Sequence, residues 1–280
     1  MMPYKDILVL LDDSKSCADR IGFAVDLAKA HEAHLTGLYV IPSPEVPGMV
    51  LSLIPDEILA ERRRLGEARA EEVVDRFRAA AEREGVSFES RVERSAPSDA
   101  ASVVALHARY ADLAVLGQQN PSDPDAPSIP PEDVLLTSGR PALIVPYIGL
   151  LSTPGSRLMI AWDAGREATR AVHDALPFLV RADSVHILCV NPKSSASGHG
   201  PEPGADIARH LARHSVRAEV EQMHVPDLST GDAILARLAD LSIDLLVTGA
   251  YGHSRMRELI LGGVTRQLLK SMTVPVFMSH

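Results

Sequence analysis

The chain has 280 residues, of which 46% are apolar and 23% charged, and its formal net charge is −9. These values are typical of a folded protein with two domains of about 140 residues each, and the negative charge disfavours non-specific binding to DNA or acidic membranes. Only 4% of the residues are aromatic, which disfavours a surface of stacked rings for sugars or single-stranded nucleic acid.

The first half alternates buried strands with amphipathic helices. Residues 6–11 read DILVLL, a continuous apolar run typical of a strand buried on both faces. Ser16 is the expected cap of the helix that follows. The pattern then predicts strands at 34–40, 86–92, 112–117 and 142–145, and helices at 16–30, 56–84, 97–110 and up to residue 138.

Two segments interrupt this alternation. Residues 118–132 contain five prolines in fifteen residues, which excludes a continuous helix or a central strand. Residues 149–155 have the composition of a linker. The chain therefore divides into domains 1–148 and 156–280.

The second half repeats the order of the first. RLMIAW at 157–162 corresponds to DILVLL, and Asp163 corresponds to Asp12. Strands are then predicted at 184–190, 216–221, 241–247 and 274–278, and helices at 167–180, 205–214, 229–240 and 263–271. Alternating strands and helices predict two doubly wound α/β domains, with ligands beyond the carboxyl ends of the parallel strands.

A glycine motif ends the fourth strand of the second half. In the segment VTGAYGHSRMRELILGGVT, Gly249 and Gly252 are three residues apart, and Gly262 and Gly263 stand before the last helix. Glycines allow close backbone approach and positive φ, and a helix start offers unpaired N–H groups. This combination suits a phosphate.

The spacing Gly249-x2-Gly252-x9-Gly262 resembles the nucleotide-binding signature of the universal stress protein family, G-x2-G-x9-G-(S/T). Gly263 stands where the family has Ser or Thr, so one hydroxyl is missing, whereas Thr265 matches a second hydroxyl position. The resemblance covers nearly the whole chain as two copies. It implies five-stranded parallel sheets of strand order 3-2-1-4-5, packed as a pseudo-dimer.

The resemblance also implies an ATP site, with Mg²⁺, in the second half. Asp163 would face the adenosine part and the backbone of Val190 the adenine edge, while His253 and Arg255 would add positive charge beside the phosphates. The expected nucleotide-binding residues are Ala161, Trp162, Asp163, Val190, Gly249, Gly252, His253, Arg255, Gly262, Gly263, Val264 and Thr265.

Several of these residues have plainer interpretations. Asp163 is also a typical turn or helix-cap aspartate, Val190 a typical core valine, and His253 and Arg255 typical loop residues. In the first half, Gly117 matches Gly249, but Asn120 replaces Gly252 and no glycine pair opens the last helix. That half is expected to have lost nucleotide binding, or to bind something else.

Other chemistry-bearing residues carry weaker signals. Cys17 and Cys189 have no metal-ligand spacing and are expected in the core; with the lack of a signal peptide they indicate a cytoplasmic protein. His210 and His214 are four residues apart on a helix without an obvious third ligand, so a metal site is not expected. No apolar run reaches the roughly 20 residues of a membrane span.

Three functions follow from these patterns. The first is a nucleotide-responsive stress regulator, at most a slow ATPase, that binds ATP and acts on unknown protein partners, with a homodimer left open. The second is a scaffold without nucleotide that assembles through edge strands such as 274–278. The third, a nucleotidyl transferase or ATP pyrophosphatase, needs an HxGH or SGGxDS loop, which neither LLDDS nor AWDAG supplies.

Overall fold

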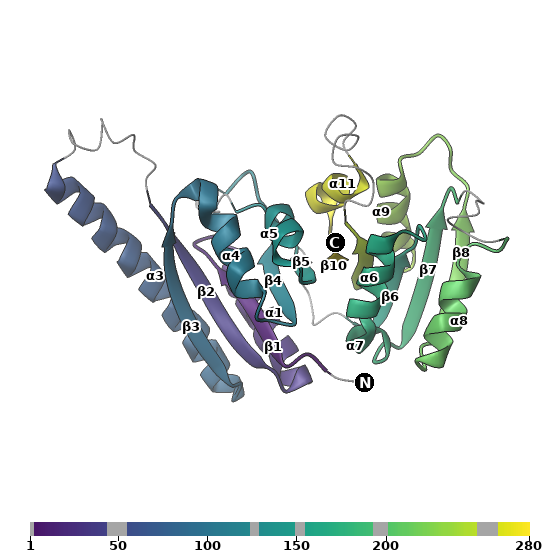
Figure 1. The fold of residues 1–280 in the computed structure, drawn as a ribbon, viewed down its shortest axis with the longest axis horizontal. Helices are drawn as coiled ribbons and strands as arrows, with labels where there is room; N and C mark the ends of the chain where they lie inside the picture. Colours follow the sequence, from purple (N-terminus) through teal and green to yellow (C-terminus); the bar gives the residue numbers. More distant parts are fainter. Residues whose placement is uncertain (1–2, 44–54, 124–128, 149–154, 193–200, 251–262) are drawn as a thin grey trace. The chain divides into compact units, whose positions relative to one another are not determined.

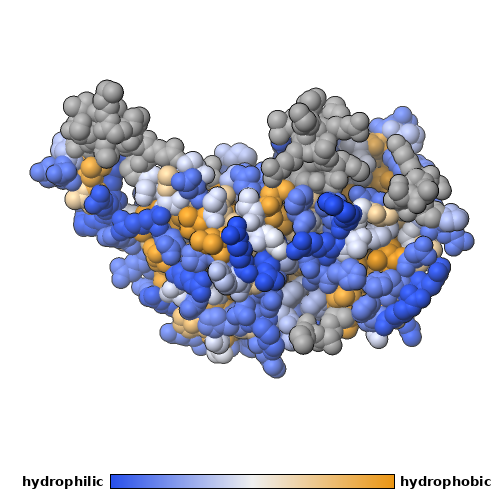
Figure 2. Space-filling view, in the orientation of Figure 1, coloured by the Kyte–Doolittle hydropathy of each residue, from blue (hydrophilic) through white to orange (hydrophobic). Residues whose placement is uncertain are grey.

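The computed structural model describes residues 3–43, 55–123, 129–148, 155–192, 201–250 and 263–280. The chain forms two compact units, one spanning Pro3–Arg140 and the other built on Pro141–His280. Both are layered α/β structures (Figure 1). Hydrophilic residues predominate on the face drawn in Figure 2, with apolar residues in smaller patches between them.

The first unit contains a parallel sheet in the order β3-β2-β1-β4. Its strands are β1 Asp6–Leu11, β2 His34–Pro42, β3 Phe88–Ser95 and β4 Leu113–Gly117. Its helices are α1 Cys17–His31, α3 Asp56–Glu84, η1 Pro97–Asp99, α4 Ala100–Ala108 and α5 Pro131–Ser138. Helix α3 packs beside α1, and α4 packs beside α5 (Figure 1).

The second unit contains a sheet in the order β5-β10-β9-β6-β7-β8. Its strands are β5 Ala142–Val145, β6 Arg157–Ala161, β7 Ser184–Val190, β8 Ala218–Met223, β9 Leu245–Gly249 and β10 Val276–Ser279. Its helices are α6 Arg166–Asp174, α7 Leu176–Leu179, α8 Ala205–Arg213, α9 Thr230–Asp240 and α11 Val264–Ser271.

The strand order of the second half agrees with the expected 3-2-1-4-5, since β8, β7, β6, β9 and β10 are its third, second, first, fourth and fifth strands. All four neighbouring pairs among them are parallel. Strand β5, which the sequence assigns to the end of the first half, lies in this compact unit and pairs antiparallel with β10. The edge of β10 that faces away from β9 is therefore paired.

Helix ends explain where observed boundaries differ from the predicted ones. The predicted strands 86–92 and 216–221 begin two residues later than expected, at Phe88 and Ala218. In each case the preceding valine closes a helix: the N–H of Val86 donates to Ala81 O at 3.0 Å, and that of Val216 donates to Leu211 O at 3.1 Å. These bonds are the six-to-one bonds that end a helix after a residue with positive φ.

Two other helices depart from prediction. The helix expected over 167–180 is divided into α6 and α7 at Ala175, because Pro177 has no N–H to continue the ladder. The helix expected over 97–110 begins as the short 3-10 turn η1. Ser229 caps α9 as predicted, its Oγ accepting from Asp232 N at 3.0 Å, whereas the hydroxyl of Ser16 makes no cap bond to α1.

Candidate functional site in the second half

The loops after β6 and β9 leave the same edge of the sheet. These strands are parallel neighbours, with Ala161 opposite Thr248, so Trp162 and Gly249 follow at the carboxyl ends of adjacent strands. This is the point at which the chain order reverses, with β7 on one side of β6 and β9 on the other. Ligands of doubly wound α/β sheets bind at this position.

Asp163 forms the turn between β6 and α6. Its Oδ1 accepts from Gly165 N at 2.8 Å, and the side chain is exposed. Burial, together with the Asp163 charge, raises the pKa of Cys189 to about 11, so the carboxylate lies near the end of β7. In the part of the chain that the structure describes, Oδ2 of Asp163 makes no hydrogen bond. The turn role is thus compatible with a ligand contact through the second oxygen.

Three further expected residues surround this turn. Ala161 ends β6, and the N–H of Trp162 donates to Leu188 O at 2.9 Å. Val190 ends β7 and is half-buried, as is Trp162. These residues lie at the carboxyl ends of β6 and β7, at the same edge of the sheet as Asp163.

Gly249 has a structural role that its motif position did not indicate. A Cβ at this residue would lie within 2.6 Å of the Glu167 carbonyl carbon and still closer to the backbone nitrogen of Ala168. The start of α6 can pack on β9 only because this position lacks a side chain. Gly249 has no positive φ, so close packing, rather than unusual dihedral angles, explains why a glycine is needed here.

Helix α11 starts where it was predicted, but Thr265, the residue expected to supply a hydroxyl, is buried. Gly263 precedes α11 with φ −55° and ψ 162°, so the predicted freedom of positive φ is not used here either. Val264 is half-buried, whereas Thr265 is only 4% exposed. The first turn of α11 therefore offers mainly backbone N–H groups. Gly252, His253, Arg255 and Gly262 lie outside the described residues.

The corresponding place in the first half

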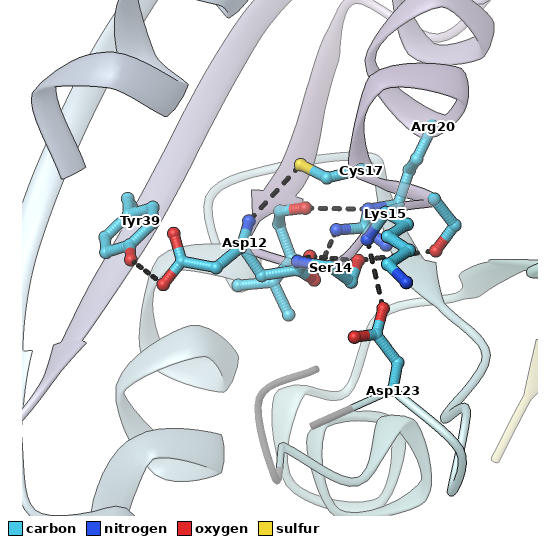
Figure 3. Close-up of polar contacts among 10 residues, drawn as sticks. Asp12, Ser14, Lys15, Cys17, Arg20, Tyr39 and Asp123 are labelled. Carbon is cyan, nitrogen blue, oxygen red and sulfur yellow. Dashed lines mark hydrogen bonds and ion pairs between the residues drawn. The ribbon is translucent and has the colours of Figure 1, made fainter. Parts of the chain in front are cut away.

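In the first unit, Arg20 lies where β1 and β4 end. Its Nε donates to Leu10 O at 2.9 Å, its guanidinium pairs with the Asp12 carboxylate, and it is only 2% exposed. A Cβ at Gly117 would overlap the guanidinium. The side chain thus occupies the carboxyl ends of β1 and β4 (Figure 3).

A second internal side chain covers the start of α1. Asp123, in the segment after β4, accepts from the backbone N–H of Lys15 through Oδ2 at 3.1 Å (Figure 3). Ser14 in the same loop donates to Asp12 through both its N–H, at 3.0 Å, and its hydroxyl. The cavity that remains here holds only about 20 Å³, far less than a nucleotide requires.

Sequence reasoning identified neither Arg20 nor Asp123 as residues of this place. The available signal was the position of Arg20, three residues after Cys17 and four before Ala24, on a buried face of α1 that is apolar apart from His31 at its end. A single arginine on such a face indicates a buried ion pair, because an unpaired charge would be very costly there.

The described residues contain neither a cluster of metal-binding side chains nor a helix that could span a membrane. The ring of His210 in α8 lies between those of His173 in α6 and His214, the residue after α8, with centroid distances of 5.0 Å to His173 and 4.8 Å to His214. However, the described side chains include no group of three or more His, Cys, Asp or Glu that could hold a metal ion. None of the described helices combines the length and apolar character needed to cross a bilayer.

Two tandem domains of doubly wound α/β type, with a glycine-lined strand end beside a helix start, define a protein class built for small ligands at the sheet edge. Residues 3–125 and 156–280 each match the Usp family, described as the Universal stress protein family. The chain belongs to this family, with one copy in each half.

Individual proteins are similar to this chain in sequence or in fold. A universal stress protein, Slr1230 of Synechocystis sp., is 47% identical over 151 residues, which are 52% of this chain and 48% of that protein. The chain thus spans about half the length of this curated relative. The crystal structure of a universal stress protein from Archaeoglobus fulgidus has a TM-score of 0.75 at 19% identity, covering 98% of this chain and 96% of that one.

A shorter universal stress protein has been solved in complex with cAMP. It is 26% identical, covers 52% of this chain and 98% of its own, and has a TM-score of 0.34.

Proposed function

We propose that this protein is a nucleotide-responsive stress regulator that binds one ATP, with Mg²⁺, in its second half. The observation that carries the proposal is the meeting of the Asp163 turn and the Gly249 strand end at one edge of the sheet, since β6 and β9 are direct neighbours. The motif from Gly249 to Gly263 adds the glycine spacing that the family uses for phosphates.

The proposed contacts follow from the chemistry of each group. The free oxygen of Asp163 would accept from ribose hydroxyls or an amino group, and the backbone at Val190 would meet the adenine edge. N–H groups at the start of α11 would meet the phosphates, with His253 and Arg255 as added positive charge. Because the described residues offer no carboxylate cluster, Mg²⁺ would be held mainly by the phosphates of ATP.

The first half is proposed to bind no nucleotide. Arg20 and Asp123 supply from within the chain a cation and an anion at the place where a ligand would lie. The two homologous halves, proposed to span 1–148 and 156–280, would thus differ in function. We propose slow hydrolysis of ATP at most, because none of the described residues beside the site is positioned as a general base.

A scaffold without nucleotide is the second candidate, and one observation weighs against its simplest form. The apolar strand β10, which could have paired with another chain, already pairs with β5 on its outer edge. Assembly through this edge would require β5 to leave. The absence of a hydroxyl at Gly263 is the feature that favours the scaffold, and Gly263→Ser tests it. A large gain in ATP affinity in this variant would favour a scaffold function for the natural chain. An unchanged affinity would favour ATP binding as its function.

Trp162 provides a direct test, because it is the chain's only tryptophan and it precedes Asp163. We expect its fluorescence to change on titration with ATP and Mg²⁺. Asp163→Asn should weaken binding by about ten-fold, the loss of one charge-assisted hydrogen bond. Asp206→Asn, on the exposed face of α8, is the matched control. No fluorescence change, or equal weakening by both variants, would contradict the proposed site.

A further inference from the structure

A separate cavity of about 610 Å³ lies within the first unit, between helix α3 and the carboxyl ends of β2 and β3. Its volume is in the range of small-molecule pockets. It is distinct from the place that Arg20 fills, which lies at the ends of β1 and β4. The lining residues used here are Asp13, Tyr39, Ile41, Leu59, Arg62, Arg63, Arg69 and Arg94.

One face of α3 supplies most of the positive charge. Leu59, Arg62, Arg63, Gly66 and Arg69 line the cavity, and their spacing places them along a single side of the helix. A Cβ at Gly66 would lie 3.0 Å from Ile41 Cγ2, so α3 approaches the end of β2 closely at this point. This approach places the exposed arginines of this face beside the cavity.

The charge of this wall is unbalanced. Among the described residues, four arginines line the cavity against one acid, Asp13, in a chain whose net charge is −9. Of these arginines, Arg94 pairs with Glu67. Among the residues that the structure describes, Arg62 and Arg63 form neither a hydrogen bond nor an ion pair. Such guanidinium groups bind carboxylates and phosphates in a bidentate manner.

Arg64, the next residue along α3, differs from these two. It does not line the cavity, and it pairs with Glu61 through Nε at 2.9 Å and Nη2 at 2.7 Å. Among the described residues, α3 thus pairs its Arg64, which lies outside the cavity, and leaves Arg62 and Arg63, which line it, without a partner. Arg62 and Arg63 are exposed, so their guanidinium groups are accessible to a ligand in the cavity.

Asp13, the acid among the described lining residues, accepts a hydrogen bond from a neighbouring tyrosine. Tyr39 Oη donates to Asp13 Oδ2 at 2.8 Å. Burial, with Asp13 beside it, raises the pKa of Tyr39, so the phenol remains protonated and keeps donating. Ile41 and Leu59 supply apolar surface at the same cavity. A ligand here would meet arginines on one side and apolar groups on the other.

We propose that this cavity binds a small organic dianion, a phosphate ester or a dicarboxylate, whose charged groups meet Arg62, Arg63 and Arg69 and whose apolar part lies against Ile41 and Leu59. The first half would then sense an anionic metabolite, while the second half responds to nucleotide. This site does not depend on the nucleotide site, and its test separates the two.

Calorimetry with phenyl phosphate and with phthalate tests the proposal, since the two probes carry the two kinds of anion on one apolar ring. We expect binding of at least one probe, weakened by about ten-fold or more in the Arg62→Gln/Arg63→Gln variant, which loses two charge-assisted contacts. Arg64→Gln is the matched control and should bind as the unmodified protein does. Which probe binds more tightly identifies the anionic group.

The titrations are repeated in saturating ATP and Mg²⁺, because either probe could enter the phosphate site of the second half. Undiminished binding in ATP is expected for a site in the first unit. Loss of binding in ATP, equal weakening by Arg64→Gln, or no binding of either probe at about 10 mM, a free energy near −3 kcal/mol, would each overturn the proposal.

Discussion

The Arg20 guanidinium and the Asp12 carboxylate form a buried ion pair at the carboxyl end of β1, with side-chain exposures of 2% and 8%. In the second half, the residue that matches Asp12 is Asp163, which is exposed and, among the described residues, bonded only to its own turn. The two halves share a strand and a turn aspartate, but in one of them an arginine has taken the place open to a ligand. This difference is the structural reason for proposing a single nucleotide site per chain.

Arg20→Met should destabilise the first unit strongly. The change leaves Asp12 buried without its cation, which costs about 3–5 kcal/mol of the free energy of unfolding. Chemical denaturation followed by circular dichroism measures the loss. Adding Asp12→Leu to this variant removes the orphaned charge and should recover most of the stability. A loss below about 1 kcal/mol, as for an exposed ion pair, would show that the pair is not buried in solution.

Gly249→Ala should destabilise the second unit without any ligand present. The added methyl meets the backbone of Glu167 and Ala168, and overpacking of this kind costs about 1–3 kcal/mol. Gly22→Ala is the matched control, since nothing lies within 4 Å of a Cβ there, and alanine should stabilise α1 by up to about 1 kcal/mol. Thermal unfolding without ATP measures both. An unaltered melting temperature for Gly249→Ala would leave ligand contact as the reason for this glycine.

The histidines of α6 and α8 predict a pH dependence of stability. Burial, then the charges of His173, His214 and Arg213, lower the pKa of His210, and its Nε2 is buried without a hydrogen bond among the described residues. A base whose pKa is lower in the folded than in the unfolded state binds fewer protons in the folded state. Its contribution to stability is thus complete above its unfolded pKa of about 6.5 and is lost as pH falls through the lower folded pKa.

Denaturation at several pH values between 7.5 and 5 measures this effect. We expect the free energy of unfolding to decrease as the pH is lowered from 7.5 to 5. The decrease should be smaller in a His210→Leu variant. His224→Leu is the control, because this exposed histidine lies outside the cluster. An equal pH slope in His210→Leu and in the unmodified protein would contradict the prediction.

Much of the fold could be predicted from hydrophobic patterns and the internal repeat. The run DILVLL and its counterpart RLMIAW identify β1 and β6, since strands buried on both faces need continuous apolar residues. The pairing of β5 could not be predicted, because four apolar residues, ALIV, fit the edge of either half equally well. The sheet order of the second half came from the family resemblance and is confirmed.

The candidate site was predictable where local chemistry decides it and not where tertiary contacts do. The turn role of Asp163 follows from an aspartate two residues before a glycine after a strand. The contact of Asp123 with Lys15 could not be predicted, since the two residues are 108 apart in sequence and the segment around Asp123 has no periodicity. The packing of Gly249 against α6 could not be predicted either, because Gly249 and the start of α6 are far apart in sequence.

Calorimetric titration of the protein with ATP and Mg²⁺, with Gly252→Val as a variant that would block the phosphate loop, is the most direct measurement of the central claim. We predict one ATP per chain and loss of binding in the variant, since the first half carries Arg20 where a ligand would lie. Two ATP molecules per chain would show that the first half is open despite Arg20. No binding at all would contradict the nucleotide proposal and favour the scaffold.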